Sequence, residues 1–282
     1  MSFAAACVSL SRQQLMAGFL ADAELTCRSA LEAAPADAEA LHLMGQIALR
    51  CYRPEEAEEH FGRAVAADPD EPLYHASLAK LLLARRRYAE AEARFRRALA
   101  LEEGDAASHN HLGAALRGQG RSAEAEACFR RALDLSPAYA EAHDSLGVVL
   151  RDRGLWEEAE FCFRNALALR PDLAEAGLNL AGLLLDTGRL AEAALLYART
   201  LAADLSRAEA AIGLARVFAA QGRREDALAL LAGARERMPG NSLVQQALRS
   251  LFCNPIEIEW PCDINNAYVI STPLESQAFT RG

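Results

Sequence analysis

The sequence repeats itself every 34 residues, and this period constrains the fold more than any local motif does. Two small residues, an aromatic residue, a third small residue and a proline recur in phase. One such set is Gly113, Ala125, Phe129, Ala132 and Pro137. Seven copies fit this frame over residues 4–241 without an insertion. The copies are residues 4–37, 38–71, 72–105, 106–139, 140–173, 174–207 and 208–241.

Each copy has the residue pattern of two amphipathic helices. In the first segment Leu112, Ala115 and Leu116 are spaced three and four apart, as one buried helical face requires. Phe129 and Ala132 form a similar stripe in the second segment. Glycine separates the two segments in four copies, where it adopts the left-handed conformation at little cost. These glycines are Gly120, Gly154, Gly188 and Gly222. We therefore expect an all-α chain of helix-turn-helix units.

A single unit cannot bury both of its apolar stripes, so the units must stack on one another as a solenoid. Residues 242–252 continue the amphipathic pattern and are expected to form a helix that caps the last unit. The chain is 52% hydrophobic but only 6% aromatic. Its core must therefore consist of small and aliphatic side chains, which suits closely packed helices.

The pattern resembles the tetratricopeptide repeat, and it is similar to the repeat portions of bacterial scaffold proteins and of repeat-containing glycosyltransferases. The resemblance implies a right-handed superhelical solenoid whose first helices line a concave surface. The chain departs from the family where an aromatic residue is usual, because His75, His109 and His143 stand early in the first helices. Equivalent positions in stacked repeats lie about 10 Å apart, too far to share a metal ion. We interpret these histidines as half-buried packing residues.

Polar residues that lie off the buried stripe of the first helices are the candidate peptide-binding residues. Their mixed charges suit hydrogen bonds to an extended peptide backbone and selection of its charged side chains. The paired lysine and asparagine set with which some members of the family grip acidic C-termini is not reproduced. The asparagine ladder of O-GlcNAc transferases is matched only at Asn179. The candidates are His42, Gln46, Arg50, Ser77, Lys80, Asn110, His111, Arg117, Asp144, Ser145, Arg151, Asn179, Asp186 and Arg216.

The sequence indicates no catalytic site, metal or cofactor. His143, Asp144 and Ser145 are the residue types of a hydrolytic triad, but consecutive helical residues diverge by about 100° and cannot hydrogen-bond in series. The seven cysteines are irregularly spaced and include no C-x-x-C pair, so they predict neither a zinc site nor a disulfide framework. Reduced thiols and a cytoplasmic location are the expectation.

Charge and hydropathy argue against nucleic-acid and membrane partners. The net charge is −9, and the densest basic cluster is interpreted as a solvated turn and outer helix face balanced by Glu90 and Glu92. No run approaches the roughly 18–20 uncharged apolar residues that span a bilayer, and residues 1–20 lack the basic start of a secretion signal. The basic cluster consists of Arg85, Arg86, Arg87, Arg94, Arg96 and Arg97.

Non-catalytic binding of a protein or extended peptide in the concave groove is the function that these features favour. One alternative is the recognition arm of an enzyme, of the protein glycosyltransferase or sulfotransferase type, whose catalytic domain would follow residue 252. Another is a scaffold that self-associates through its terminal repeats or tail. Residues 253–282 change abruptly in composition. Three explanations are open: the start of a second domain, a segment that docks in a groove, or non-native sequence from a frameshift. The abrupt change in composition favours the first or the third.

Overall fold

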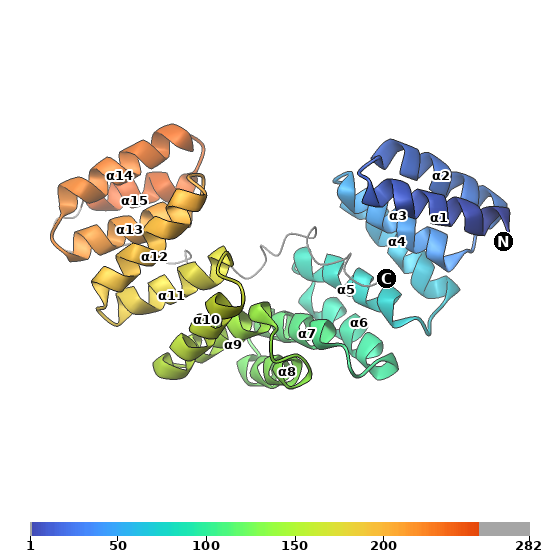
Figure 1. Cartoon of the computed structure of the whole chain (residues 1–282), viewed down its shortest axis with the longest axis horizontal. Helices are drawn as coiled ribbons and strands as arrows, with labels where there is room; N and C mark the ends of the chain where they lie inside the picture. The colour runs from blue at the N-terminus through green and yellow to red at the C-terminus, as the bar shows by residue number, and fades with distance from the viewer. Residues whose placement is uncertain (1, 254–282) are drawn as a thin grey trace. The chain divides into compact units, whose positions relative to one another are not determined.

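The computed structural model describes residues 2–253, which form fifteen α-helices and no strand in that range (Figure 1). The first helices of the repeats are α1 (Phe3–Met16), α3 (Ala38–Arg50), α5 (Pro72–Ala84), α7 (Ala106–Gly118), α9 (Ala140–Asp152), α11 (Ala174–Asp186) and α13 (Ala208–Ala220). The second helices are α2 (Leu20–Ala33), α4 (Pro54–Ala67), α6 (Tyr88–Leu101), α8 (Ser122–Leu135), α10 (Trp156–Leu169), α12 (Leu190–Ala203) and α14 (Arg224–Arg237). The last helix is α15 (Ser242–Cys253).

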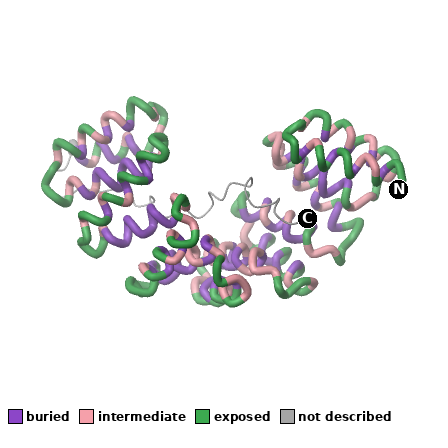
Figure 2. The backbone as a smooth tube through the Cα atoms, in the orientation of Figure 1, coloured by how far each residue is buried: buried purple, intermediate pink, exposed green. Residues whose placement is uncertain are grey.

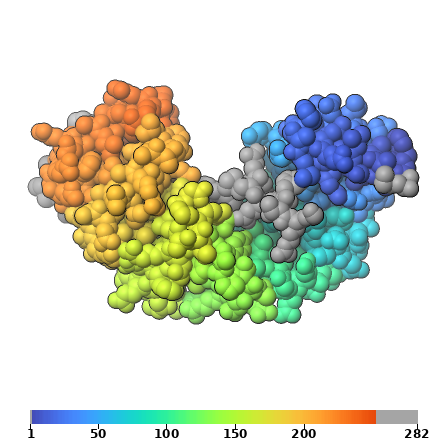
Figure 3. All heavy atoms as spheres, viewed as in Figure 1, coloured from blue at the N-terminus to red at the C-terminus, as the bar shows by residue number. Residues whose placement is uncertain are grey.

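The helices form two compact units, in which α1–α8 make up unit 1 and α9–α15 make up unit 2. Within each unit a first helix packs on its own second helix, and that second helix packs on the next first helix. Side chains of successive repeats close into a continuous layer in each unit (Figure 3). The prediction of an all-α solenoid of helix-turn-helix units is therefore confirmed in both units.

Each unit curves with its first helices on the inner side. First helices of neighbouring repeats contact each other directly, as α5 does with α7 and α11 does with α9 and α13. Among the described residues, no two second helices pack as extensively. The first helices are consequently the more buried set, as α11 and α12 illustrate (Figure 2).

In three repeats the core depends on an aromatic ring that lies against a glycine of the first helix, where no side chain separates the two helices. Phe61, Phe129 and Phe163 are at most 1% exposed. A methyl group added to the Cα of Gly147 would lie 2.6 Å from Cε1 of Phe163, well inside van der Waals contact. Gly45 and Gly113 face Phe61 and Phe129 in the same way, at 2.6 Å and 2.7 Å.

The turn between the two helices has a left-handed residue at the same place in seven repeats. Gly18, Gly120, Gly154, Gly188 and Gly222 hold φ between +76° and +83° there. Tyr52 and Arg86 occupy this place in two repeats, with φ of +57° and +59°. The turn geometry is thus imposed by the helix packing on either side, even where the residue disfavours it.

Arginines in these turns each form ion pairs with two glutamates and so link neighbouring repeats. We call each such set an arginine fork. Arg121 Nη1 lies 2.7 Å from Glu92 on the preceding second helix, and its Nη2 lies 2.6 Å from Glu124 on its own second helix. Arg189 repeats the fork with Glu160 and Glu192, both at 2.7 Å. The remaining forks in unit 1 are Arg53 with Glu24 and Glu56, and Arg87 with Glu58 and Glu90.

The histidines early in the first helices close the turn between repeats. Nε2 of His75, His109 and His143 donates to the carbonyl oxygens of residues 69, 103 and 137, at 3.0, 3.1 and 3.0 Å. Gln245 in α15 donates to the carbonyl of Pro239 at the same spacing. His75 is buried, and the other two histidines are half-buried. Each side chain thus satisfies a carbonyl of the turn as well as packing.

The last described helix lies against the final helix pair. α15 packs on α13 and α14 and buries Val244, Ala247, Leu248 and Leu251. Our interpretations of the tail concern residues that lie outside the described range, apart from Cys253. In residues 2–253, none of the helices combines the length and apolarity needed to cross a membrane.

Gly147→Ala should destabilise the chain by about 1–3 kcal/mol, because the added methyl overlaps the Phe163 ring in a packed core. Gly62→Ala is the matched control, since nothing lies within 4 Å of the added methyl in α4. That variant should gain about 0.5–1 kcal/mol from the helix preference of alanine. Urea unfolding followed by circular dichroism measures both, and effects of the same sign would contradict the packing explanation.

Glu92→Gln should lower the free energy of unfolding by about 2–3 kcal/mol, because it removes the charge that balances Arg121 and Arg96 at a nearly buried position. Only 9% of the Glu92 side chain is exposed. Glu59→Gln breaks an ion pair whose side chains are 47% and 70% exposed, so we expect a loss below about 1 kcal/mol. Equal losses in the two unfolding curves would show that the fork adds no stability.

Candidate functional site

The inner face of unit 1 begins with a hydrogen bond between neighbouring first helices. His42 in α3 and Ser77 in α5 are 35 residues apart in sequence, and His42 Nε2 lies 2.8 Å from Ser77 Oγ. The His42 ring is 5.4 Å from the Phe61 ring and 5.0 Å from the Tyr74 ring, measured between centroids. His42 is therefore held between an apolar layer and a hydroxyl group.

This environment keeps the His42 imidazole uncharged. Burial lowers the pKa of His42 to about 4, and the positive charges of Arg12 and Lys80 act in the same direction. At neutral pH the ring can donate one hydrogen bond and accept another. Tyr74 also lies in this region, and burial raises the pKa of its hydroxyl to about 12.

Next along the inner face lies Lys80, the only lysine among the 30 basic residues of the chain. Within the described residues its ammonium group makes no ion pair and no hydrogen bond, and burial lowers the pKa of Lys80 although Asp105 opposes this. His111 in α7 donates from Nδ1 to the Ala107 carbonyl at 2.6 Å and stacks on Phe95. Burial, reinforced by Lys80, lowers the pKa of His111 to about 4.

The inner face of unit 2 repeats the bond between first helices with other residues. Asn179 in α11 donates from Nδ2 to Asp144 Oδ1 in α9 at 2.9 Å, again across 35 positions. Further along, Arg151 pairs with Asp152 at 3.2 Å, and Arg216 pairs with Asp186 at 3.9 Å. This face is polar and carries both signs of charge, as unit 1 does.

All fourteen predicted binding residues lie on first helices, but they differ in exposure. His42, Asn110, Arg151 and Asn179 are buried, at 1–8% exposed, and so contribute chiefly to helix packing. Asp186 is exposed. The remaining residues are partly exposed, and these are Gln46, Arg50, Ser77, Lys80, His111, Arg117, Asp144, Ser145 and Arg216.

Besides the polar pattern, two features of the sequence could have indicated this arrangement. One is the 35-residue spacing of the hydrogen-bonded pairs, which is one more than the repeat period. The other is the occurrence of a single lysine in a chain that otherwise uses arginine. Tyr74 and Asp105 also belong to the inner face, although neither fits the pattern of polar residues in the middle of a first helix.

The candidate chemistry outside this face has structural explanations. His143 donates to the Pro137 carbonyl while Asp144 accepts from Asn179, so these two side chains have separate partners. In the described part of the chain no cluster of three or more histidine, cysteine, aspartate or glutamate residues is placed to hold a metal ion. Four arginines of the basic cluster are paired with acidic residues, and these are Arg85, Arg87, Arg96 and Arg97.

Family models described as tetratricopeptide repeat match the chain from residue 14 to residue 251 without a gap. The matches fall at residues 14–81 and 184–251 for one model and at 75–107, 104–172 and 145–204 for three others. A comparison with curated protein sequences finds no match.

Solved structures of repeat proteins share the fold at low identity. A tetratricopeptide repeat protein from Parabacteroides merdae is 18% identical over 89% of this chain and 99% of its own, with a TM-score of 0.72. A chain of the APC/C hetero-tetramer Cut9–Hcn1 is 16% identical over 87% of this chain and 52% of its own, with a TM-score of 0.73. YrrB, described as having an unusual peptide-binding site, is 24% identical over 67% of this chain and 98% of its own, with a TM-score of 0.51.

Acidification from pH 7 to pH 5 should weaken the fold through His42 and His111. Their pKa values are lowered to about 4, whereas an unfolded histidine takes up its proton near pH 6.5. The stability is therefore present above pH 6.5 and is lost as the pH falls towards 4, by about 1–2 kcal/mol per histidine at pH 5. In urea unfolding at pH 7, 6 and 5, the double variant His42→Gln, His111→Gln should lose less stability than the wild type. Parallel pH curves would contradict the assignment of neutral imidazoles.

Proposed function

Because the chain belongs to the tetratricopeptide repeat family, we propose that it is a non-catalytic interaction module that binds a protein or extended peptide on the first-helix face of its units. The fold implies protein–protein interaction. The family's groove-binding mode supports the assignment of the ligand to the inner face, where the polar side chains gather.

Lys80 is the observation that carries this proposal. An ammonium group that is partly removed from water and has no partner is costly, and a ligand that brings oxygen acceptors would lower that cost. Backbone carbonyls of an extended peptide are such acceptors. Ser77 and the neutral imidazole of His111 stand on the same face and offer further hydrogen bonds, as a peptide backbone requires.

The thiols fit a reducing compartment such as the cytoplasm. Cys7, Cys27, Cys51, Cys128 and Cys162 are all free. Burial raises the pKa of Cys27 to about 11, so this thiol is unreactive at neutral pH. The buried cysteines are thus packing residues.

Lys80→Gln should abolish capture of the partner by the full chain in a pull-down from the native host, analysed by mass spectrometry. Glutamine is one bond shorter and can still hydrogen-bond, but it lacks the charge, and the helical circular dichroism should stay unchanged. Arg131→Ala is the control, because this arginine lies on second helix α8 and pairs with Glu103 at 3.5 Å. Equal recovery with Lys80→Gln and with the control would rule out this face of unit 1 as the binding surface.

A further inference from the structure

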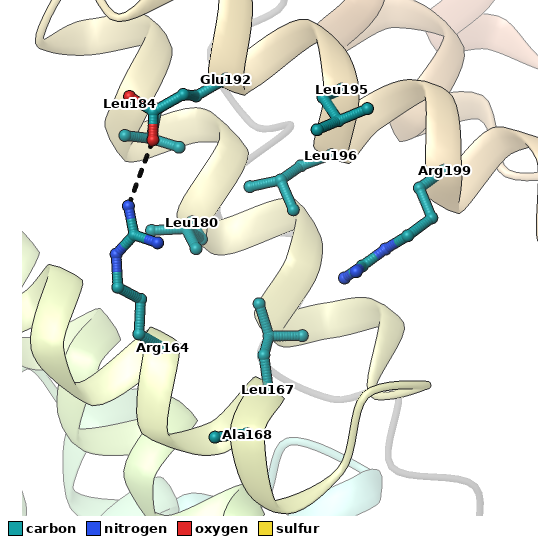
Figure 4. A pocket seen from close by; sticks show the side chains of 9 residues that line it. All are labelled: Arg164, Leu167, Ala168, Leu180, Leu184, Glu192, Leu195, Leu196 and Arg199. Atoms are coloured by element: carbon teal, nitrogen blue, oxygen red, sulfur yellow. Dashed lines mark hydrogen bonds and ion pairs between the residues drawn. The ribbon is translucent and has the colours of Figure 1, made fainter.

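A leucine-lined cavity of about 370 Å³ opens between the second helices of unit 2. Its floor is formed by Leu180 and Leu184 of α11, which are 2% and 1% exposed. Its walls come from α10 and α12, and Leu195 on the rim is 71% exposed. The remaining wall residues are Leu167, Ala168 and Leu196 (Figure 4). We call this cavity the α10–α12 groove.

The two ends of the α10–α12 groove carry different charges. At one end Arg164 and Glu192 form an ion pair at 3.3 Å, so their charges cancel. At the other end the Arg199 guanidinium extends over the cavity (Figure 4). Within the described residues Arg199 makes no ion pair and no hydrogen bond, which leaves one uncompensated positive charge beside an apolar surface.

The equivalent arginines of unit 1 do not behave like Arg199. Arg97 reaches back to Asp70 in the preceding turn at 2.8 Å, and Arg131 reaches back to Glu103 at 3.5 Å. Asp172 stands 27 residues before Arg199, as Asp70 does before Arg97, yet no ion pair joins Asp172 and Arg199 in the structure. The free guanidinium is therefore a property of this groove rather than of the repeat.

A comparable hollow beside α4 in unit 1 has no leucine among the described residues that line it. Its lining consists of Glu55, Glu58, Glu59, Gly62, Arg63, Ala66 and Arg85. Both of its arginines are paired, since Arg85 lies 2.6 Å from Glu58 and 3.1 Å from Glu55, and Arg63 lies 3.9 Å from Glu59. The hollow in unit 1 is thus lined by paired charges, whereas the α10–α12 groove is apolar with one cation that pairs with no described residue.

We propose that the α10–α12 groove is a second docking surface, which binds an amphipathic helix of a protein partner. A helix fits because the groove runs between two helices, and a third helix can lie against both at the usual spacing of about 8–10 Å. Its aliphatic face would cover Leu195 and fill the cavity, and a glutamate or aspartate next to that face would pair with Arg199. This surface faces away from the first helices, so it is independent of peptide binding on the inner face.

The test uses the full chain and a synthetic 18-residue alanine-based helical peptide labelled with fluorescein. The peptide carries leucines at every third or fourth position, flanked by glutamates. Fluorescence anisotropy should show saturable binding, and Leu195→Glu and Arg199→Glu should each raise the Kd at least tenfold. A peptide with lysines in place of the glutamates should bind weakly to the wild type and regain affinity for Arg199→Glu.

Matched controls occupy the same repeat positions in unit 1. Leu25→Glu changes a leucine that is 68% exposed, and Arg131→Glu changes the counterpart of Arg199. Both should leave the Kd of the peptide unchanged, as should Lys80→Gln, which separates this surface from the inner face. Circular dichroism checks that each variant is folded. Absence of binding, or equal weakening by the unit 1 controls, would overturn the proposal.

A photo-crosslinker in place of Leu195, used with and without added peptide, identifies the occupant. Crosslinks to residues 254–282 of the same molecule would assign the groove to the chain's own tail. Crosslinks between isotopically distinct copies would assign it to self-association. Either result would overturn a partner helix as the occupant, whereas a groove that crosslinks only to added peptide supports it.

Discussion

In three repeats a buried aromatic ring on the second helix determines how closely the first helix can approach. Where Phe163 faces Gly147, the space between the two helix backbones is filled by the ring, and no Cβ fits between them. This contact accounts for the low aromatic content and high alanine content together, because such a repeat needs only one ring and several small residues around it. The arginine forks, the turn geometry and the inner-face hydrogen bonds all require the helix spacing that this contact fixes.

The 34-residue period and the composition predict most of the helices. They predict fewer of the side-chain contacts. The 34-residue period and the apolar stripes place the two helices of each repeat because these depend on local propensity and spacing. They do not predict the left-handed Tyr52 and Arg86, because there tertiary packing overrides the preference of the residue. They also miss the role of His75, whose partner is a backbone carbonyl that exists only once the turn has formed.

The candidate site, too, could be predicted only in part from the sequence. First-helix polar residues could be found by counting positions, but their exposure could not, because it depends on how closely neighbouring first helices approach. Asn179 is 1% exposed since the bond to Asp144 draws α9 and α11 together. The free charge at the α10–α12 groove could not be predicted from the period, because Arg199 lacks, within the described residues, the ion pair that its counterparts make. Unit 2 therefore presents a polar inner face and, at the α10–α12 groove, an apolar patch on its second helices.

Within residues 2–253, the hydrogen bonds that join repeats connect residues at most 35 positions apart. Because these contacts are local in sequence, the conformational search during folding is short. Packing of one repeat does not depend on a distant part of the chain. A repeat emerging from the ribosome can pack as soon as the next first helix has been synthesised, and growth of the solenoid can follow translation from the N-terminus. The fork at Arg121, for example, needs nothing beyond Glu124 to be complete.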